Sequence, residues 1–271
     1  PVWHSFERIV QYAIIGVSDT IAYSKPIGAI MLPDFQAIKP QWMASVPRIW
    51  ESVKDGIYKS MRQAGGAKKA LFTFFIGIGK SHAALRNMLL GRLPNFGNRS
   101  RIVDILVPII PLILLTPLAA LGNVLVFKKI KAKLGGKFIA GVSGGGAMPA
   151  SVDVFFDAIG VQLLEGYGLT ETAPVIALRP QHKPVQGTVG PAIRGTEFKI
   201  LDDNGYDIGT GRKGVVYVRG PQIMKGYYKK TEMTAKVLGA DGWLNTGDLG
   251  MLTKDRLDRK STSLNSSPGK I

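Results

Sequence analysis

The sequence has no cysteine and only three histidines among its 271 residues. The absence of cysteine excludes a disulfide framework, a thiolate metal site and a cysteine nucleophile. Three histidines are too few to favour a multi-histidine metal centre. A chain without disulfides suits a reducing compartment, and we expect a cytoplasmic location.

Acidic residues are also scarce, because 19 Asp and Glu oppose 35 Lys and Arg and leave a formal charge of +16. Such a charge predicts an anionic partner, which is nucleic acid, a phosphate ligand or an anionic membrane surface. The basic segments have no zinc-finger spacing and no aromatic pattern of RNA recognition, so we expect no nucleic-acid partner. With 45% hydrophobic residues, the chain is able to bury a substantial core.

One stretch lacks charge altogether. The 23 residues 105–127 contain no Asp, Glu, Lys or Arg, which is long enough for a membrane-crossing helix. Pro108, Pro111 and Pro117 argue against a straight span, so we expect a bent re-entrant hairpin or a helix lying in the membrane interface. Basic residues at both ends favour a peripheral or monotopic segment on the cytoplasmic face of a membrane. The alternative is a buried helical hairpin inside a soluble domain.

The middle of the chain alternates strand, turn and helix patterns. Residues 135–142 predict a buried strand that ends in the glycine turn 143–146, and residues 152–159 have apolar positions at helical spacing. Residues 161–164 predict a second short strand that opens directly into a glycine loop, residues 165–168. This order is typical of an α/β domain whose loops at strand ends hold a ligand.

The pattern changes after about residue 184. Residues 197–201 and 215–219 are strand-like, and a turn-forming Asp-Asn-Gly sequence follows the first of them, which predicts a mainly antiparallel β subdomain. The Ser/Lys/Arg-rich end has no apolar periodicity, and we interpret it as an unrelated or disordered tail. The predicted organisation is an α/β domain over 1–183, a β-rich subdomain of the same domain over 184–255, and the tail over 256–271.

The first segment with the composition of a ligand site is EGYGLTETAP. Gly166 and Gly168 allow the backbone to approach a flat ligand, and the ring of Tyr167 between them offers a stacking face. Thr170 offers a hydroxyl to a phosphate group, and Glu171 offers a hard oxygen to magnesium. This combination suits a nucleotide, although a tyrosine in a glycine turn is by itself more often a packing residue.

The second such segment is DGWLNTGDLG, residues 241–250. Asp248 lies on a glycine-bounded turn, where its carboxylate is able to accept two hydrogen bonds from a ribose diol. Each segment alone is a weak indication of nucleotide binding. The two together, in this order, are a much stronger one.

The chain resembles the adenylate-forming, AMP-binding superfamily, and most closely its long-chain fatty-acid CoA ligase branch. EGYGLTET is similar to the adenine-binding motif of that family, and SGGGAMP to the glycine turn before it. GTVGPAIRGTEFKI and DGWLNTGDLG are similar to two further motifs, the second of which begins the ribose-binding and linker segment. The resemblance extends over about residues 1–255 and implies part of the large N-terminal α/β domain of the adenylate-forming fold.

The resemblance also implies residue roles. Thr170 and Glu171 are the implied catalytic residues, with Glu171 holding Mg²⁺, and His4 and Gly144 are implied on the acyl side of the site. For His4 an ordinary core or surface role is the alternative. The implied nucleotide-binding residues are Gly145, Gly146, Glu165, Gly166, Tyr167, Gly168, Thr170 and Asp248.

The implied reaction joins a long-chain fatty acid to ATP, giving acyl-AMP and pyrophosphate, and then transfers the acyl group to coenzyme A. ATP, Mg²⁺ and coenzyme A are thus the expected cofactors and co-substrates. Alternatives are an aryl- or medium-chain acid ligase and a non-catalytic membrane- or lipid-binding module. The family's phosphate loop, linker arginine and C-terminal lysine have no counterpart in the sequence, so we expect a fragment that does not complete catalysis alone.

Overall fold

The computed structural model describes residues 4–97, 99–253 and 259–261 and divides the chain into two compact units. We name them the helical unit, Val10–Leu93 with Ser100–Leu164, and the β unit, Pro1–Ile9 with Pro94–Arg99 and Glu165–Ile271. The predicted boundary at residue 184 stays a prediction.

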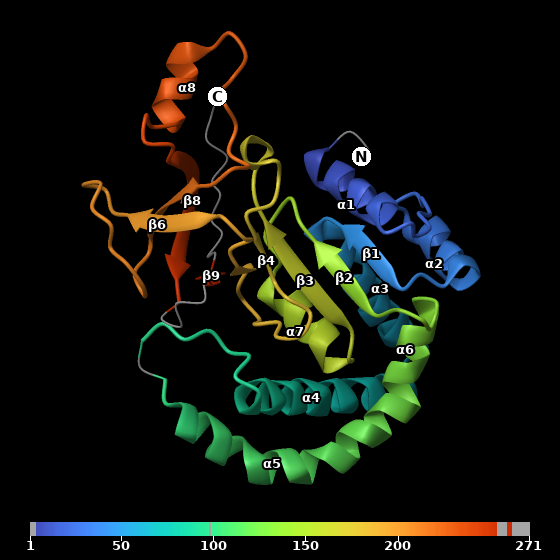
Figure 1. Cartoon of the computed structure of the whole chain (residues 1–271). Helices are drawn as coiled ribbons and strands as arrows, with labels where there is room; N and C mark the ends of the chain where they lie inside the picture. Colours follow the sequence, from blue (N-terminus) through green and yellow to red (C-terminus); the bar gives the residue numbers. More distant parts are fainter. Residues whose placement is uncertain (1–3, 98, 254–258, 262–271) are drawn as a thin grey trace. The chain divides into compact units, whose positions relative to one another are not determined.

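The helical unit combines parallel strands with packed helices (Figure 1). Strands β1 (Trp42–Ser45) and β2 (Ala140–Ser143) pair in parallel, and β3 (Gln162–Tyr167) is next in the strand order. The turn η1 (Asn123–Phe127) is π-helical. The helices of this unit are α2 (Gly28–Ile38), α3 (Pro47–Ala64), α4 (Gly66–Leu89), α5 (Arg101–Gly122), α6 (Lys128–Lys133) and α7 (Ala150–Ala158).

Local sequence explains the helix that carries much of this core. Pro47 occupies the first turn of α3, where its missing N–H has no intrahelical partner to lose. Trp50 and Val53 follow at helical spacing and are buried in one cluster with the aromatic residues of α7, where Trp50 contacts the ring of Phe156. The predicted helix over 152–159 is confirmed as α7, whereas the predicted strand over 135–142 is shorter and begins at Ala140.

The uncharged stretch 105–127 does not form the bent re-entrant hairpin that its prolines predicted, and the other prediction, a helix lying in the membrane interface, stays a prediction. A continuous helix runs from α5 through η1 into α6, with Pro108, Pro111 and Pro117 inside α5. The helix packs along α4 and curves around it (Figure 1), which spreads the distortion that each missing hydrogen bond introduces. The alternative of a buried hairpin is also wrong, because much of the apolar surface of α5 is exposed.

The β unit holds the predicted antiparallel sheet, which is confirmed. Its strand order is β5-β9-β8-β7-β6, and each neighbouring pair is antiparallel. Buried and half-buried residues alternate along β7, as β-branched residues on one face of a sheet predict. The five strands are β5 (Gly190–Pro191), β6 (Glu197–Leu201), β7 (Gly214–Arg219), β8 (Leu244–Leu252) and β9 (Arg259–Ser261).

Strand β9 lies within the stretch predicted to have no fold. Its three residues pair with β5 and with Met251 and Leu252 of β8 through main-chain groups. Main-chain pairing needs no apolar side chains, so a search for apolar periodicity does not detect it. The remainder of the predicted tail, residues 256–258 and 262–271, lies outside the described residues.

Candidate nucleotide site

The first predicted motif begins inside a strand and not in a loop. Strand β3 continues past Leu164 to Tyr167, because Gly166 and Tyr167 pair with Leu178 and Ala177 of β4 (Ala177–Leu178). The prediction that the strand ends at Leu164 is therefore wrong. The glycine in the motif suggested a loop, but the partner strand satisfies the main chain at that position.

The Glu165 side chain forms a buried ion pair with Arg179. The Arg179 Nη2 atom lies 3.0 Å from Glu165 Oε2, and the side chains are 7% and 1% exposed for Glu165 and Arg179. Arg179 also donates from Nε and Nη2 to the carbonyl of Thr188, at 3.0 and 2.7 Å. Sequence reasoning did not single out Arg179, because nothing in a sequence marks a distant arginine as the partner of this carboxylate. The nucleotide role implied for Glu165 stays a prediction.

Tyr167 and Asp248 meet in the β unit. The Tyr167 hydroxyl, at the end of β3, donates to Asp248 Oδ2 on β8 over 2.8 Å. These two residues are 81 positions apart in the chain, one in each of the two predicted nucleotide motifs. The carboxylate retains further acceptor positions, since an ionised Asp accepts about four hydrogen bonds. The structure thus places an aromatic ring and a carboxylate acceptor in one cluster.

A β-bulge presents Asp248. Asn245 pairs with Tyr217 and Leu249 with Val215, so three residues of β8 oppose the single residue Val216 between them. The Thr246 hydroxyl donates to the carbonyl of Val216 over 2.8 Å and accepts from the main-chain N–H of Asp248 over 3.2 Å. Bulges re-aim side chains that a regular strand would direct elsewhere. Thr246 is a positioning residue that the sequence analysis missed.

Gly168 permits the sharp turn that follows Tyr167. A Cβ atom at this position would overlap the carbonyl oxygen of Pro174, so no other residue fits the observed backbone. The Thr172 hydroxyl then accepts from the N–H of Leu169 over 2.9 Å and fixes the 3₁₀ turn η2 (Thr170–Thr172). Thr170 and Glu171 are therefore held on a short, internally bonded turn.

Thr170 is exposed, and its hydroxyl oxygen lies 3.4 Å from the Ser5 hydroxyl at the start of α1 (Ser5–Gly16). His4 precedes Ser5 and is also exposed, and its Nδ1 accepts from the N–H of Phe6 over 3.2 Å. The structure therefore brings the predicted phosphate contact next to the N-terminal segment. The acyl-side role of His4 stays a prediction.

Glu171 is held by a residue that sequence reasoning did not find. The Tyr227 hydroxyl donates to Glu171 Oε1 over 2.8 Å, and this bond and the negative charge raise the pKa of Tyr227. Within the described ranges no group of three or more His, Asp or Glu side chains forms a metal cluster. A single carboxylate fits Mg²⁺ that is otherwise held by nucleotide phosphates, because Mg²⁺ in such sites takes one or two protein carboxylates.

The glycine turn after β2 belongs to the helical unit. Gly144 is buried, whereas Gly145 and Gly146 are exposed. Just before them, the Ser143 hydroxyl oxygen is fully buried and has no hydrogen-bond partner among the described residues. A buried hydroxyl without a partner is unusual, and it lies at the carboxyl end of a parallel strand, where α/β folds bind ligands.

The ionisation of Tyr167 gives a pH prediction. Burial, together with the negative charge of Asp248, raises the pKa of Tyr167 well above its ordinary value. The folded state therefore keeps a proton that the unfolded state loses above about pH 10. Above about pH 10, we expect Tyr167 to lower the free energy of unfolding by about 1.4 kcal/mol for each pH unit. Below about pH 10, the contribution of Tyr167 should not change with pH.

Urea unfolding of the wild type and of Tyr167→Phe between neutral and strongly alkaline pH measures this contribution. The phenylalanine variant is expected to show a shallower alkaline decline. Tyr206→Phe is the matched control, because Tyr206 is exposed. Equal alkaline slopes for Tyr167→Phe and the wild type would contradict the buried, carboxylate-bonded tyrosine.

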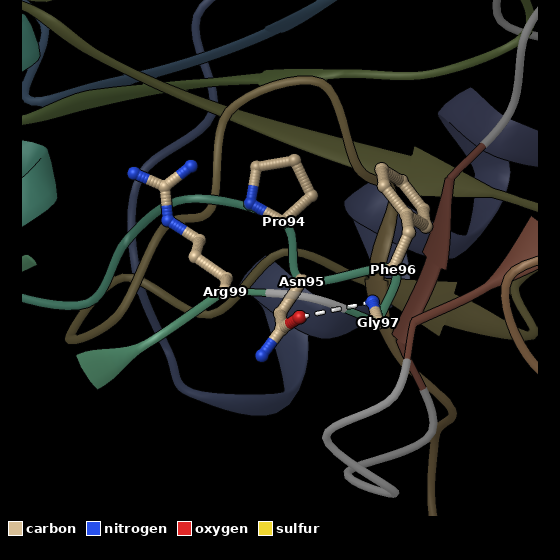
Figure 2. Close-up of a pocket in the computed structure, with 5 residues that line it drawn as sticks. All are labelled: Pro94, Asn95, Phe96, Gly97 and Arg99. Carbon is tan, nitrogen blue, oxygen red and sulfur yellow. Dashed lines mark hydrogen bonds between the residues drawn. The ribbon is translucent and has the colours of Figure 1, made fainter. Parts of the chain in front are cut away.

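A separate concavity in the β unit does not coincide with the predicted site (Figure 2). It has a volume of about 420 Å³, and the main-chain N–H of Gly97 donates to Asn95 Oδ1 over 3.1 Å at its wall. None of the predicted site residues is among the residues that line it. These residues are Pro94, Asn95, Phe96, Gly97 and Arg99.

Comparison with known proteins identifies the class to which these motifs belong. The model of the family described as AMP-binding enzyme matches residues 1–228. The chain belongs to the AMP-binding enzyme family, so the predicted family and fold class are confirmed.

Three relatives come from Arabidopsis thaliana. Probable acyl-activating enzyme 16, chloroplastic, is 37% identical over 97% of this chain and 37% of its own length. Long-chain-fatty-acid--[acyl-carrier-protein] ligase AEE15, chloroplastic, is 37% identical over 93% of this chain and 35% of its own length. Long chain acyl-CoA synthetase 7, peroxisomal, is 35% identical over 93% of this chain and 32% of its own length. The chain thus spans about a third of the length of these curated relatives.

Proposed function

We propose that the chain provides the nucleotide-binding part of a long-chain fatty-acid ligase that activates its substrate as an acyl-adenylate. The observation that carries this proposal is the hydrogen bond between Tyr167 and Asp248, which joins the two predicted nucleotide motifs. Membership of the AMP-binding family and relatives named for long-chain acyl activation support it.

Each residue of the cluster has a distinct task in this proposal. The ring of Tyr167 stacks on adenine, and the Asp248 carboxylate accepts hydrogen bonds from the ribose hydroxyls. Thr170 contacts a phosphate group through its hydroxyl, and Glu171 would hold Mg²⁺, which neutralises phosphate charge when bound. The resemblance to the family assigns Gly145 and Gly146 to the adenylate, and assigns Gly144 and His4 to the acyl group.

The proposed chemistry needs no nucleophile from the protein. A carboxylate oxygen of the fatty acid attacks the α-phosphorus of ATP, and the bond to pyrophosphate breaks. A thiol sulfur then attacks the acyl carbonyl carbon, loses its proton, and displaces AMP. The protein's contribution is to hold reactants of like charge together and to balance their charge.

Coenzyme A is the thiol acceptor that we propose. A second candidate is the thiol of an acyl carrier protein, because one relative at 37% identity is named as an acyl-carrier-protein ligase. A relative named as an acyl-CoA synthetase is 35% identical, so identity does not separate the two acceptors. Binding of coenzyme A and of an acyl carrier protein to the chain loaded with a stable acyl-adenylate analogue would distinguish them.

Asp248→Ala tests nucleotide recognition directly. The substitution removes the ribose acceptor, and hydrogen bonds to charged groups contribute about 1.5–3 kcal/mol each. We therefore expect ATP to bind this variant about 10- to 100-fold more weakly than the wild type in isothermal titration calorimetry with Mg²⁺ present.

Asp203→Ala is the matched control, since Asp203 is an exposed acid in the turn after β6. It is expected to bind ATP as the wild type does. A stable analogue of a long-chain acyl-adenylate and its benzoyl counterpart extend the experiment to the acyl side. Tighter binding of the benzoyl analogue would favour an aryl-acid ligase, and wild-type affinity in Asp248→Ala would overturn the proposed nucleotide site.

A further inference from the structure

The long helix formed by α5, η1 and α6 is apolar on both of its sides. Its inner side packs against α4, where the ring of Phe75 lies against Gly122, and the Phe127 side chain lies against Gly79. Its outer side should be polar if it faced only water. Instead, large apolar side chains are exposed at helical spacing, namely Ile102, Val103, Leu106, Val107, Ile110, Ile113, Leu114, Leu118, Leu121, Val124 and Leu125.

Positive charge lies at both ends of this exposed stripe. Arg101 is exposed at its beginning, where its guanidinium also donates to the carbonyls of Met88 and Leu89. Exposed lysines follow at its end, namely Lys128, Lys129 and Lys133. The single acid between Arg101 and Lys133 is Asp104, which is buried. The exposed side of the helix thus presents apolar side chains and cations without a carboxylate.

The packing of the helix determines how it meets a membrane. The helix Arg101–Lys133 is long and apolar enough to cross a bilayer, and it is the one such helix found in the described part of the chain. However, α5 packs along α4 (Figure 1), and α4 carries Lys68, Lys69 and Lys80. A crossing helix would bring those charges into the hydrocarbon, whereas a helix parallel to the surface leaves them outside.

We propose that the outer side of α5–η1–α6 is a docking surface for an anionic lipid bilayer, in which the helix lies parallel to the membrane plane. Ile110 and Leu114 and their neighbours enter the acyl boundary, and the terminal lysines, together with Arg101, lie at the level of the lipid phosphates. Charge complementarity selects a lipid surface over a protein groove, because cations border the stripe at both ends. This inference does not depend on the proposed function.

Vesicle co-flotation of the full chain tests the surface. Vesicles of phosphatidylcholine with phosphatidylglycerol are expected to carry the protein, and pure phosphatidylcholine vesicles to carry much less. The double variant Ile110→Asp/Leu114→Asp should bind anionic vesicles more than about tenfold less tightly, because two carboxylates oppose both insertion and the surface charge. Tyr206→Asp is the matched control, since Tyr206 is 72% exposed, against 71% and 69% for Ile110 and Leu114.

A second variant separates charge from insertion. Lys128→Gln/Lys129→Gln removes two exposed cations and no apolar side chain, so it leaves the packing on α4 in place. Its affinity for anionic vesicles should fall about fivefold per lysine, and its weak binding to neutral vesicles should not change. Equal binding of this variant and the wild type to anionic vesicles would contradict the charge contribution.

The absence of cysteine permits a direct measurement of orientation. Environment-sensitive labels on Leu106→Cys, Leu114→Cys and Leu121→Cys should report similar, shallow depths in the vesicle. Depths that pass through the bilayer centre would instead show a crossing helix. The wild type could instead fail to bind vesicles and form dimers that Ile110→Asp/Leu114→Asp abolishes. That result would show that a second copy covers the stripe and that the lipid proposal is wrong.

Discussion

Arg179→Ala is expected to lower the free energy of unfolding by about 3–5 kcal/mol, because it leaves the Glu165 carboxylate buried without its cation. The loss also removes both side-chain donors that Arg179 directs to the carbonyl of Thr188. The measurement is urea denaturation at neutral pH, followed by circular dichroism. Because this pair lies at the start of the proposed nucleotide motif, we also expect Arg179→Ala to lose affinity for ATP.

Arg219→Ala provides the matched control for this prediction. Arg219 also pairs with a glutamate, Glu197, and the Nη2 to Oε2 distance is 2.8 Å, but these side chains are 43% and 58% exposed. Water solvates both partners when an exposed pair is broken, so the loss should be far smaller. Equal losses in the two variants would show that burial does not determine the strength of the Glu165 pair.

In the helical unit, Trp50→Ala should lower the free energy of unfolding by a similar amount. Trp50 is 0% exposed and makes edge-to-face contacts with Phe156 and Phe138, with ring centroids 5.4 and 6.1 Å apart. Gly141 of β2 lies so close to the indole that a Cβ atom there would overlap it. Removing the side chain leaves a cavity between β2, α3 and α7, and the free energy of unfolding should fall by about 3–5 kcal/mol.

The comparison variant is Trp42→Ala. Trp42 lies on β1 and is 43% exposed, so the same truncation leaves little cavity, and the expected loss is below about 1 kcal/mol. Trp50→Phe should lie between the two, because it keeps an aromatic ring and removes an indole N–H that has no hydrogen-bond partner among the described residues. A loss for Trp50→Ala no larger than that for Trp42→Ala would contradict the assigned core.

The sequence predicted those helices and strands whose residue pattern is visible within a few consecutive turns or residues of the chain. Apolar spacing located α7, and the strand-like composition of residues 197–201 and 215–219 located β6 and β7. The motif glycines predicted a close approach of the backbone to a flat ligand, which stays a prediction, whereas the close neighbour of Gly168 in the structure is the carbonyl of Pro174. The predicted nucleotide motifs also come together at Tyr167 and Asp248.

Features that depend on distant partners could not be predicted in this way. Arg179 and Tyr227 take their importance from Glu165 and Glu171, and no spacing rule connects them. The extension of β3 to Tyr167 depends on the pairing strand β4. The three prolines favoured a hairpin as long as α5 was considered alone, whereas packing along α4 supports a continuous helix.

The bulge in β8 affects which changes of chain length this region tolerates. Ladder pairs lie on both sides of it, at Asn245 with Tyr217 and at Leu249 with Val215. Deleting or inserting one residue between Asn245 and Leu249 would shift one of these ladders by a residue and turn its side chains to the opposite face of the sheet. Divergent copies of this segment should therefore differ from one another by substitution and keep a constant number of residues.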